Sequence, residues 1–180
     1  MSPLPVEVAP GAVLRRLTMD DLDAIWTLVN AERERVGRWM PWIELTNSID
    51  DERAWLTTVT ADPQNLEGGG LFVDGSYAGG VGLTIGAFGI DGEIGYWIGS
   101  AHEGRGLVTA ACRALIDIGF RERGLHRITI RAGVENVRSR AIPERLGFTR
   151  EGLQREAGRG MGRYYDLVIY GLLESEWNRS

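Results

Sequence analysis

The chain has 180 residues and a mass of 19.9 kDa, with 43% hydrophobic and 25% charged residues, as expected for one globular domain. Its formal net charge is -5, and all 20 residues in the combined Lys and Arg count are arginine. Because lysine is absent, Schiff-base chemistry, a pyridoxal phosphate anchor and a Gly-Lys-Ser/Thr phosphate loop are excluded. No apolar run approaches the roughly 18 residues of a membrane span, so we expect no membrane partner.

The charges are distributed unevenly along the chain. Residues 1–100 hold 6 Arg against 15 Asp and Glu, whereas residues 101–180 hold 14 Arg against 10, so an anionic ligand is expected to bind the second half. The single cysteine, Cys112, excludes an internal disulfide, and with only two histidines in the chain we expect no metal site. This cysteine usage and an N-terminus without signal-peptide features predict a cytoplasmic location.

The first hundred residues predict two helices followed by three strands. Residues 1–11 hold three of the six prolines and are expected to form a flexible leader before a single domain over residues 12–180. A strand is expected at 13–17 and a helix from Thr18 to about Arg35, because apolar residues recur there at helical spacing. A second helix is expected from Ser48 to before Pro63, and antiparallel strands at 71–73, 77–88 and 93–98.

The remainder of the chain alternates helices with strands. A long helix is expected over 107–123, closed by Gly124, and then a strand over 126–132. Asn136 is expected to cap a short helix that Gly147 ends, and strands follow at 148–153 and 163–173. This order predicts an α/β fold with one mixed, mainly antiparallel sheet flanked by helices.

The strongest site signal is the loop between the third strand and the long helix. In the run Trp97-Ile-Gly-Ser-Ala-His-Glu-Gly-Arg-Gly-Leu-Val-Thr109, the backbone N–H groups that open the helix have no partner inside it. Together with the helix dipole they can bind an anion, and Gly104 and Gly106 allow the backbone a tight turn and a close approach to phosphate. A plain strand-to-helix connection is the alternative.

Other catalytic motifs are absent from the sequence. Gly80-Val-Gly82 lies within a strand and lacks the third glycine of a dinucleotide fingerprint. No Gly-x-Ser-x-Gly occurs, and Cys112 falls within a predicted helix, where a structural thiol is favoured over a nucleophile. Dinucleotide binding and nucleophilic triad chemistry are therefore not expected.

Four motifs together resemble those of the GCN5-related N-acetyltransferase superfamily, and within it the RimJ/RimL type that acetylates the N-termini of ribosomal proteins. They occur in family order and spacing, and the resemblance extends over nearly the whole chain. The motifs are Gly92-Glu-Ile-Gly-Tyr-Trp-Ile98, Glu-Gly-Arg-Gly at 103–106, Val134-Glu-Asn-Val-Arg-Ser-Arg-Ala141 and Glu-Arg-Leu-Gly-Phe at 144–148.

The resemblance implies that acetyl-coenzyme A (acetyl-CoA) binds where the sheet splays apart, with its pyrophosphate on the loop and its pantetheine arm along the strand that ends at Ile98. Two of three family loop positions differ here: Glu103 stands for Arg or Gln, and Val108 for Gly or Ala. Glu103 is therefore expected to point away from the phosphates. The implied cofactor-binding residues are Trp97, Ile98, Gly99, Glu103, Gly104, Arg105, Gly106, Leu107, Val108, Asn136, Arg138, Ser139 and Arg140.

The implied reaction is direct attack of a neutral amine on the thioester, and two side chains are candidates for its proton transfers. Glu93 is the candidate base, with a water chain or a merely solvent-facing carboxylate as alternatives. Ser139 is the candidate proton donor to the thiolate, because Pro143 occupies the position where many superfamily members have a tyrosine. Pro143 also opens the helix at residue 139, although Ser139 can instead bond its own backbone.

The acceptor groove is expected at the aromatic loop after the first helix. Trp39 and Trp42 flank Pro41 there and can shape a substrate pocket, although plugging the core is an equal alternative. The implied function is acetyl-CoA-dependent N-acetylation of a protein N-terminal amine, as in the ribosomal-protein type. Acetylation of a small amine, or coenzyme A binding without catalysis, are the alternatives; a homodimer is possible, and direct nucleic-acid binding is not expected from a negatively charged chain without lysine.

Overall fold

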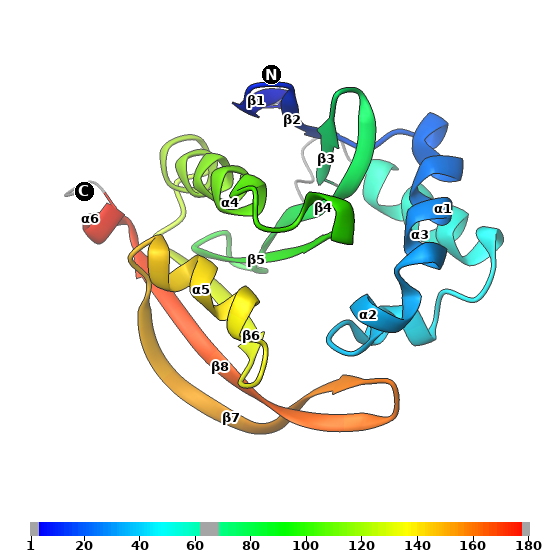
Figure 1. Ribbon diagram of the computed structural model, residues 1–180. Helices are drawn as coiled ribbons and strands as arrows, with labels where there is room; N and C mark the ends of the chain where they lie inside the picture. The colour runs from blue at the N-terminus through cyan, green and yellow to red at the C-terminus, as the bar shows by residue number, and fades with distance from the viewer. Residues whose placement is uncertain (1–3, 62–68, 178–180) are drawn as a thin grey trace.

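An eight-stranded sheet runs through the computed structural model, which describes residues 4–61 and 69–177 (Figure 1). All neighbouring strands pair antiparallel except β5 and β6, which are parallel. The predicted α/β class with a mainly antiparallel sheet is thus confirmed. In spatial order the strands are β1 (Val6–Ala9), β2 (Ala12–Arg16), β3 (Gly69–Val73), β4 (Ser76–Ile85), β5 (Asp91–Ile98), β6 (Arg127–Gly133), β8 (Arg163–Leu173) and β7 (Thr149–Gly160).

Helices form two groups around this sheet (Figure 1). The first group is α1 (Leu22–Ala31), α2 (Arg33–Gly37) and α3 (Ile49–Ala61); the second is α4 (Leu107–Asp117) and α5 (Val137–Arg145), with α6 (Glu174–Trp177) near the C-terminus. Shorter helical turns are η1 (Met19–Asp21), η2 (Pro41–Glu44), η3 (Ser100–His102) and η4 (Ile118–Glu122).

The alternation of side chains along the strands creates two separate cores. Leu71 packs into a cluster with the buried residues of α4, whereas its neighbour Phe72 packs into a second cluster with the buried residues of α1 and α3. Successive residues of a strand point to opposite faces, so α4 covers one face of the sheet and α1 and α3 cover the other. Cys112 lies fully buried in the first cluster, as expected for a structural thiol.

The sheet separates at its only parallel pair among the described strands. β5 pairs with β6 only from Asp91 to Glu93, opposite residues 127–129 of β6. Beyond that point β6 remains paired with β8 along its whole length, while β5 remains paired with β4. The second half of β5 therefore has one edge without a neighbouring strand, and the predicted splay of the strands is confirmed.

The N-terminal prediction of a flexible leader needs correction. Val6–Ala9 forms β1, which pairs with β2 and thereby joins the sheet. A tight turn makes this possible, because Gly11 adopts a φ of 71°, a conformation that glycine reaches without steric cost. The alternation of Val6 and Val8 about Glu7 was the strand signal.

Two predicted helices are interrupted, and one strand is longer than expected. The first helix breaks at Glu32 (φ -101°, ψ 5°), which separates α1 from α2. The long helix changes from α to π geometry at Ile118, although Gly124 ends it with a φ of 65°, as predicted. β7 continues to Gly160 through a bulge between Gln154 and Gly158. The second helix is described to Ala61, and Pro63 lies outside the described residues.

Candidate active site

A cleft of about 940 Å³ lies where β5 loses its parallel neighbour. Its walls come from α2, β5, the loop before α4, and the helices α4 and α5. The structure thus gathers around one cavity residues of the loop at 97–109 and of the motif at 134–141, which are about 40 positions apart in the sequence. Of the predicted cofactor-binding residues, those that line the cleft are Trp97, Ile98, Glu103, Gly104, Gly106, Leu107, Val108, Asn136, Arg138 and Ser139.

The start of α4 presents unpaired backbone donors to this cleft. Gly104 and Gly106 have φ values of 73° and 75°, and Gly106 is the N-cap of α4 without any side-chain cap. The first N–H that bonds within the helix is that of Ala110, to the carbonyl of Gly106. The N–H groups of Leu107 and Val108 precede it and have no intrahelical partner, while their side chains are buried in the first core. Backbone donors and the helix dipole therefore create an anion site.

Two predicted loop residues lie outside the cleft lining. The N–H of Gly99 donates to the carbonyl of Ala78 at 2.8 Å, which anchors the end of β5 to β4. Arg105 is exposed, and its Nη1 lies 3.2 Å from Nδ1 of His102. Gly99 thus positions the loop, and in this structure the Arg105 guanidinium contacts a side chain of its own loop.

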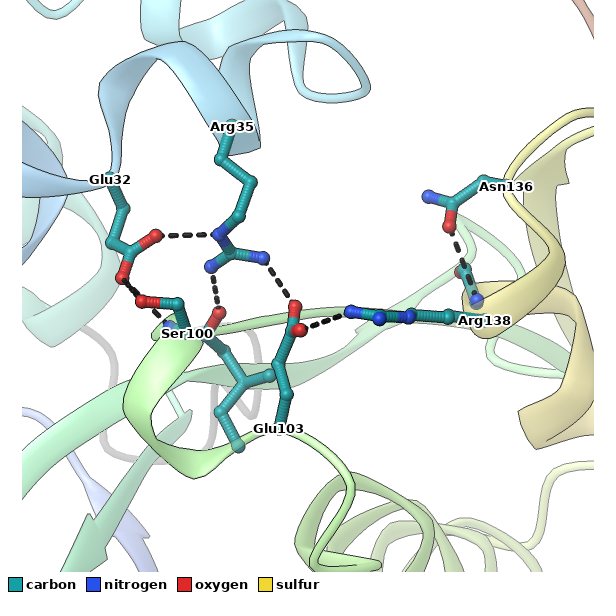
Figure 2. Close-up of polar contacts among 8 residues, drawn as sticks. Glu32, Arg35, Ser100, Glu103, Asn136 and Arg138 are labelled. Atoms are coloured by element: carbon teal, nitrogen blue, oxygen red, sulfur yellow. Dashed lines mark hydrogen bonds and ion pairs between the residues drawn. The ribbon is translucent and has the colours of Figure 1, made fainter.

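Glu103 lies within a network of ion pairs, which Figure 2 shows. Its Oε1 accepts from Nη1 of Arg35 at 2.6 Å, and its Oε2 accepts from Nη1 of Arg138 at 2.5 Å. The carboxylate lines the cleft and is held between two guanidinium groups. Two neighbouring guanidinium groups thus balance the charge of Glu103, and its orientation away from bound phosphates stays a prediction.

Arg35 joins this pair to the end of β5 (Figure 2). Its Nη2 donates to the carbonyl of Ile98, and its Nε donates to Glu32, whose other carboxylate oxygen accepts from the N–H and hydroxyl of Ser100 at 2.7 and 2.6 Å. Burial acts to raise the pKa of Glu32, but the bonds from Ser100 and Arg35 outweigh it and hold that pKa below its usual value. The network fixes α2 against the loop that carries the anion site.

The opposite wall of the cleft is built by α5. Asn136 caps this helix as predicted, because its Oδ1 accepts the N–H of Ser139 at 3.2 Å. The cap leaves the amide NH₂ of Asn136 as its donor group. Ser139 lines the cleft, and its hydroxyl lies 3.3 Å from the phenol oxygen of Tyr96 on β5.

Two of the three arginines of α5, Arg138 and Arg140, have different surroundings. The Arg138 side chain is 85% exposed, lines the cleft and pairs with Glu103. Arg140 turns away from the cleft, where it donates to the hydroxyl of Tyr170 at 3.0 Å and to the carbonyl of Val134 at 2.9 Å. The structure thus brings Arg138 to the cleft, and it places Arg140 where it fastens α5 to β8 and to the preceding loop.

Glu93 lies at the closed end of the split, in the part of β5 that still pairs with β6. Its carboxylate accepts from Nε of Arg131 at 2.9 Å, and both side chains are about half-exposed. Glu93 points to the face of β5 opposite to Tyr96, because three positions separate them along the strand. It is not among the described residues that line the cleft, so its role as a base stays a prediction.

Of the two tryptophans expected in the acceptor groove, one reaches the cleft. Trp39 lines it and packs edge-on against Tyr165, with ring centroids 5.2 Å apart. Gly133 allows this approach, since a Cβ there would lie 2.6 Å from the indole ring. Trp42 instead packs against Trp97, at 6.0 Å between ring centroids, and belongs to the second core.

The cleft also contains residues that the sequence reasoning missed. Tyr96 lies inside a quoted motif, and its position between Ile94 and Ile98 on one face of β5 was the available signal. Arg145 also lies inside a quoted motif, the one at 144–148, whereas Arg113 is a helix arginine outside every motif, so nothing in the sequence set it apart. The cleft-lining residues that were missed include Arg35, Met40, Tyr96, His102, Arg113 and Arg145.

Two further observations concern the described residues as a whole. Within residues 4–61 and 69–177, no group of three or more His, Cys, Asp and Glu side chains is placed to hold a metal ion. In the same part of the chain, no helix has the length and apolar character needed to cross a membrane.

The fold and cleft together define a class of enzyme, the acyltransferases in which a split sheet and a helix N-terminus hold a phosphorylated substrate. Residues 12–149 match the family model described as acetyltransferase (GNAT) domain. The chain therefore belongs to the GNAT family of N-acetyltransferases, which confirms the predicted family and reaction class.

Individual relatives agree with this assignment. A putative ribosomal N-acetyltransferase, YdaF of Bacillus subtilis (strain 168), is 38% identical over 169 residues, which cover 91% of this chain and 92% of the relative. A crystal structure of a probable acetyltransferase is 35% identical, covers 97% of this chain and 99% of that chain, and has a TM-score of 0.88. The microcin C7 self-immunity acetyltransferase MccE, solved with acetyl-CoA and AMP, is 27% identical, with 96% and 98% coverage and a TM-score of 0.85.

Proposed function

We propose that the cleft binds acetyl-CoA and that the chain transfers its acetyl group to the N-terminal α-amine of a protein. The observation that carries the proposal is the meeting, in one cleft, of an unpaired edge of β5 with the unpaired N–H groups at the start of α4. The edge offers hydrogen bonds to an extended amide-containing arm, and the helix start offers donors to a diphosphate. The structural relative MccE was solved with acetyl-CoA, which supports this choice of ligand.

The arginines of the cleft fit the charge of this substrate. Arg138, Arg113 and Arg145 all line the cleft and come from its two helical walls. Arg145 lies 3.4 Å from the hydroxyl of Thr109, next to the start of α4, while Arg113 stacks over Trp177 at 5.4 Å. Guanidinium groups bind phosphate through charge-assisted hydrogen bonds, so these three side chains supply the cationic surface for the phosphates of acetyl-CoA.

The proposed chemistry requires two proton transfers. A neutral amine nitrogen attacks the thioester carbonyl, the C–S bond breaks as the C–N bond forms, and the sulfur leaves as a thiolate. Ser139, on the cleft wall formed by α5, donates a proton to that thiolate and recovers a proton from solvent before the next turnover. The proton that the acceptor ammonium must lose passes to Glu93 or to a water chain. The water chain is an alternative because Glu93 is ion-paired with Arg131 and lies outside the cleft lining.

A peptide terminus can approach from the α2 side of the cleft. Val36, Trp39 and Met40 line that side, so an acceptor and acetyl-CoA would share one continuous cavity. Likeness over 91% of the chain to a putative ribosomal N-acetyltransferase supports a protein α-amine as the acceptor. A ribosomal-protein acceptor would place the enzyme in the cytoplasm, as its cysteine usage predicts; the homodimer stays a prediction.

Release of free thiol from acetyl-CoA tests the proposal. We expect release with peptides that carry a free N-terminus and none with the same peptides after N-terminal acetylation, which is the matched control. The chain has no lysine, so it presents no side-chain amine of its own to add a background signal. Faster release with spermidine or amino acid amides would instead support a small-amine acceptor, and binding without any thiol release would identify a coenzyme A-binding module without catalysis.

A further inference from the structure

Pro143 leaves one carbonyl of α5 without a helical partner. Proline has no N–H, so within the helix Val137–Arg145 the carbonyl of Ser139, four residues earlier, receives no bond from position 143. A half-buried carbonyl that lacks a donor destabilises a fold, so a donor from elsewhere is expected. The structure supplies one from β5: the phenol of Tyr96 donates to the Ser139 carbonyl at 2.9 Å.

The same phenol also contacts the side chain of Ser139. The Ser139 hydroxyl donates to the phenol oxygen at 3.3 Å, so one tyrosine holds both the backbone and the side chain of one serine. Tyr96 and Ser139 are 43 positions apart, and they come from β5 and α5, which both line the cleft. Burial raises the pKa of Tyr96, so the phenol stays protonated and keeps its donor.

We propose that Tyr96 is a positioning residue for Ser139, and that it fixes the serine hydroxyl beside the place where the thiolate forms. This inference rests on the proton-donor role of Ser139 proposed above. With the phenol hydrogen committed to the Ser139 carbonyl, the phenol oxygen can only accept from the serine hydroxyl. The hydroxyl therefore has a defined orientation before acetyl-CoA binds, and it turns from the phenol to the sulfur when charge develops there.

The geometry also gives Pro143 a role. A residue other than proline at position 143 would donate its N–H to the Ser139 carbonyl, and that carbonyl would no longer need the Tyr96 phenol as a donor. The proline thus makes α5 depend on β5 for one hydrogen bond at the position of the proposed proton donor. Tyr96 is consequently expected to matter for both stability and turnover, through two different bonds.

The turnover bond is tested by combining Tyr96→Phe with Ser139→Ala. We expect Tyr96→Phe to lower kcat about five- to fiftyfold and to leave KM for acetyl-CoA within about twofold, and we expect no further loss when it is added to Ser139→Ala. Tyr164→Phe, which removes a phenol hydroxyl from an exposed side chain of β8, is the matched control and should leave kcat unchanged.

The two proposals fail in different ways. If Ser139→Ala lowers kcat but Tyr96→Phe multiplies that loss in the double variant, Tyr96 does not act through Ser139 and the positioning role is overturned. If Tyr96→Phe leaves kcat unchanged while Ser139→Ala lowers it, the positioning role is also overturned and the role of Ser139 stands. Full turnover in Ser139→Ala overturns the proton-donor role and, with it, the inference drawn from it.

The carbonyl bond is tested by stability, independently of activity. Tyr96→Phe should lower Tm by about 2–6 °C in the natural chain, because it leaves the Ser139 carbonyl without a donor. In a Pro143→Ala background the new N–H serves that carbonyl, so the same substitution should lower Tm by less than half as much. The loss of turnover should persist in that background, because the serine hydroxyl still lacks its acceptor. Equal Tm losses in both backgrounds would overturn the assignment of the carbonyl bond.

Discussion

The two walls of the cleft are built in different ways. At the start of α4 the donors are backbone N–H groups, and the side chains of Leu107 and Val108 are turned into the core. On the α5 wall the groups that line the cleft are the side chains of Asn136, Arg138 and Ser139. Asn136 caps the helix by accepting the N–H of Ser139, Arg138 donates to the Glu103 carboxylate, and the Ser139 hydroxyl donates to the Tyr96 phenol oxygen.

This difference separates two kinds of sensitivity to substitution. A wall made of backbone tolerates changes of side chain as long as the turn is preserved, which explains how Glu103 and Val108 can depart from the family pattern. A wall made of side chains depends on the individual group. Substitutions at the start of α4 should therefore change substrate affinity, and only where they change the conformation of a glycine. Substitutions on α5 should have effects that depend on the group removed, and at Ser139 the quantity affected should be turnover.

The largest expected effect is that of Ser139→Ala. Removing the proposed proton donor should lower kcat roughly ten- to a thousandfold, with little change in the Kd for acetyl-CoA, because the hydroxyl is needed only when the thiolate leaves. Steady-state kinetics and calorimetric titration measure the two quantities. Ser76→Ala, at the exposed start of β4, is the control, and an unchanged kcat in Ser139→Ala would contradict the proposed role.

The next effect is expected from Gly106→Ala. A Cβ at this position meets no atom within 4 Å, so the substitution adds only the strain of a non-glycine residue at a φ of 75°. That strain is about 1–2 kcal/mol, and relief of it would turn the N–H groups away and raise KM for acetyl-CoA about five- to thirtyfold. kcat at saturation should be nearly unchanged.

Gly75→Ala is a matched control for this substitution. Gly75 has a φ of 80° and the same open surroundings, but it lies in the β3–β4 turn. It should lower Tm while leaving KM as it is. If the two glycine variants raised KM equally, the backbone interpretation of the α4 wall would be wrong.

A smaller effect should distinguish Arg138 from Arg140 on α5. Arg138→Ala removes a cationic group of the cleft and should raise KM for acetyl-CoA about three- to tenfold with little change in Tm, because its side chain is exposed. Arg140→Ala should do the opposite, lowering Tm by about 2–6 °C with KM unchanged, because it leaves the Val134 carbonyl and the Tyr170 hydroxyl without their donor. A change of KM in Arg140→Ala alone would reverse this assignment.

The smallest expected effect is the pH dependence of the Glu32 network. The pKa of Glu32 is lower in the folded chain than its usual value of 4.5, so its contribution to stability is present above that pH and is lost as pH falls through the folded value. Glu32→Gln should therefore lower Tm at pH 7 and flatten the decline of Tm below pH 4.5. Glu34→Gln, an exposed neighbour on α2, should leave the decline as it is; an equal flattening would show that the effect is not specific to Glu32.

Local sequence signals predicted much of the fold and half of the site. The glycines at 104 and 106, the cap at Asn136 and the stop at Gly124 act through their own backbone or that of near neighbours, so each can be recognised from a short segment. The sheet class followed from the order of such segments. Among the strands of the described residues, β1 alone was missed, because three prolines in the first eleven residues outweighed a short Val-Glu-Val alternation; the short helix α6 was missed as well.

Contacts between distant positions could not be predicted in the same way. Arg35 and Glu103 are 68 positions apart, and Tyr96 and Ser139 are 43 apart, so no periodicity connects them. The orientation of a long side chain was equally inaccessible: Arg138 and Arg140 lie two positions apart on one helix, yet only Arg138 reaches the cleft. Helical spacing gives the direction of the Cα–Cβ bond, whereas the course of the rest of the side chain depends on the partners available in three dimensions.

The short pairing of β5 with β6 has one more consequence. A strand edge inside a protein is normally paired, and an exposed one attracts other chains. Here the unpaired edge of β5 lies between helices, where a folded partner is too bulky to reach it. An extended molecule about one strand spacing wide, roughly 5 Å, can reach it. The split sheet thus selects its ligands first by their thickness, before any side chain takes part in recognition. This favours slender, flexible molecules both as the acetyl donor and as the acceptor.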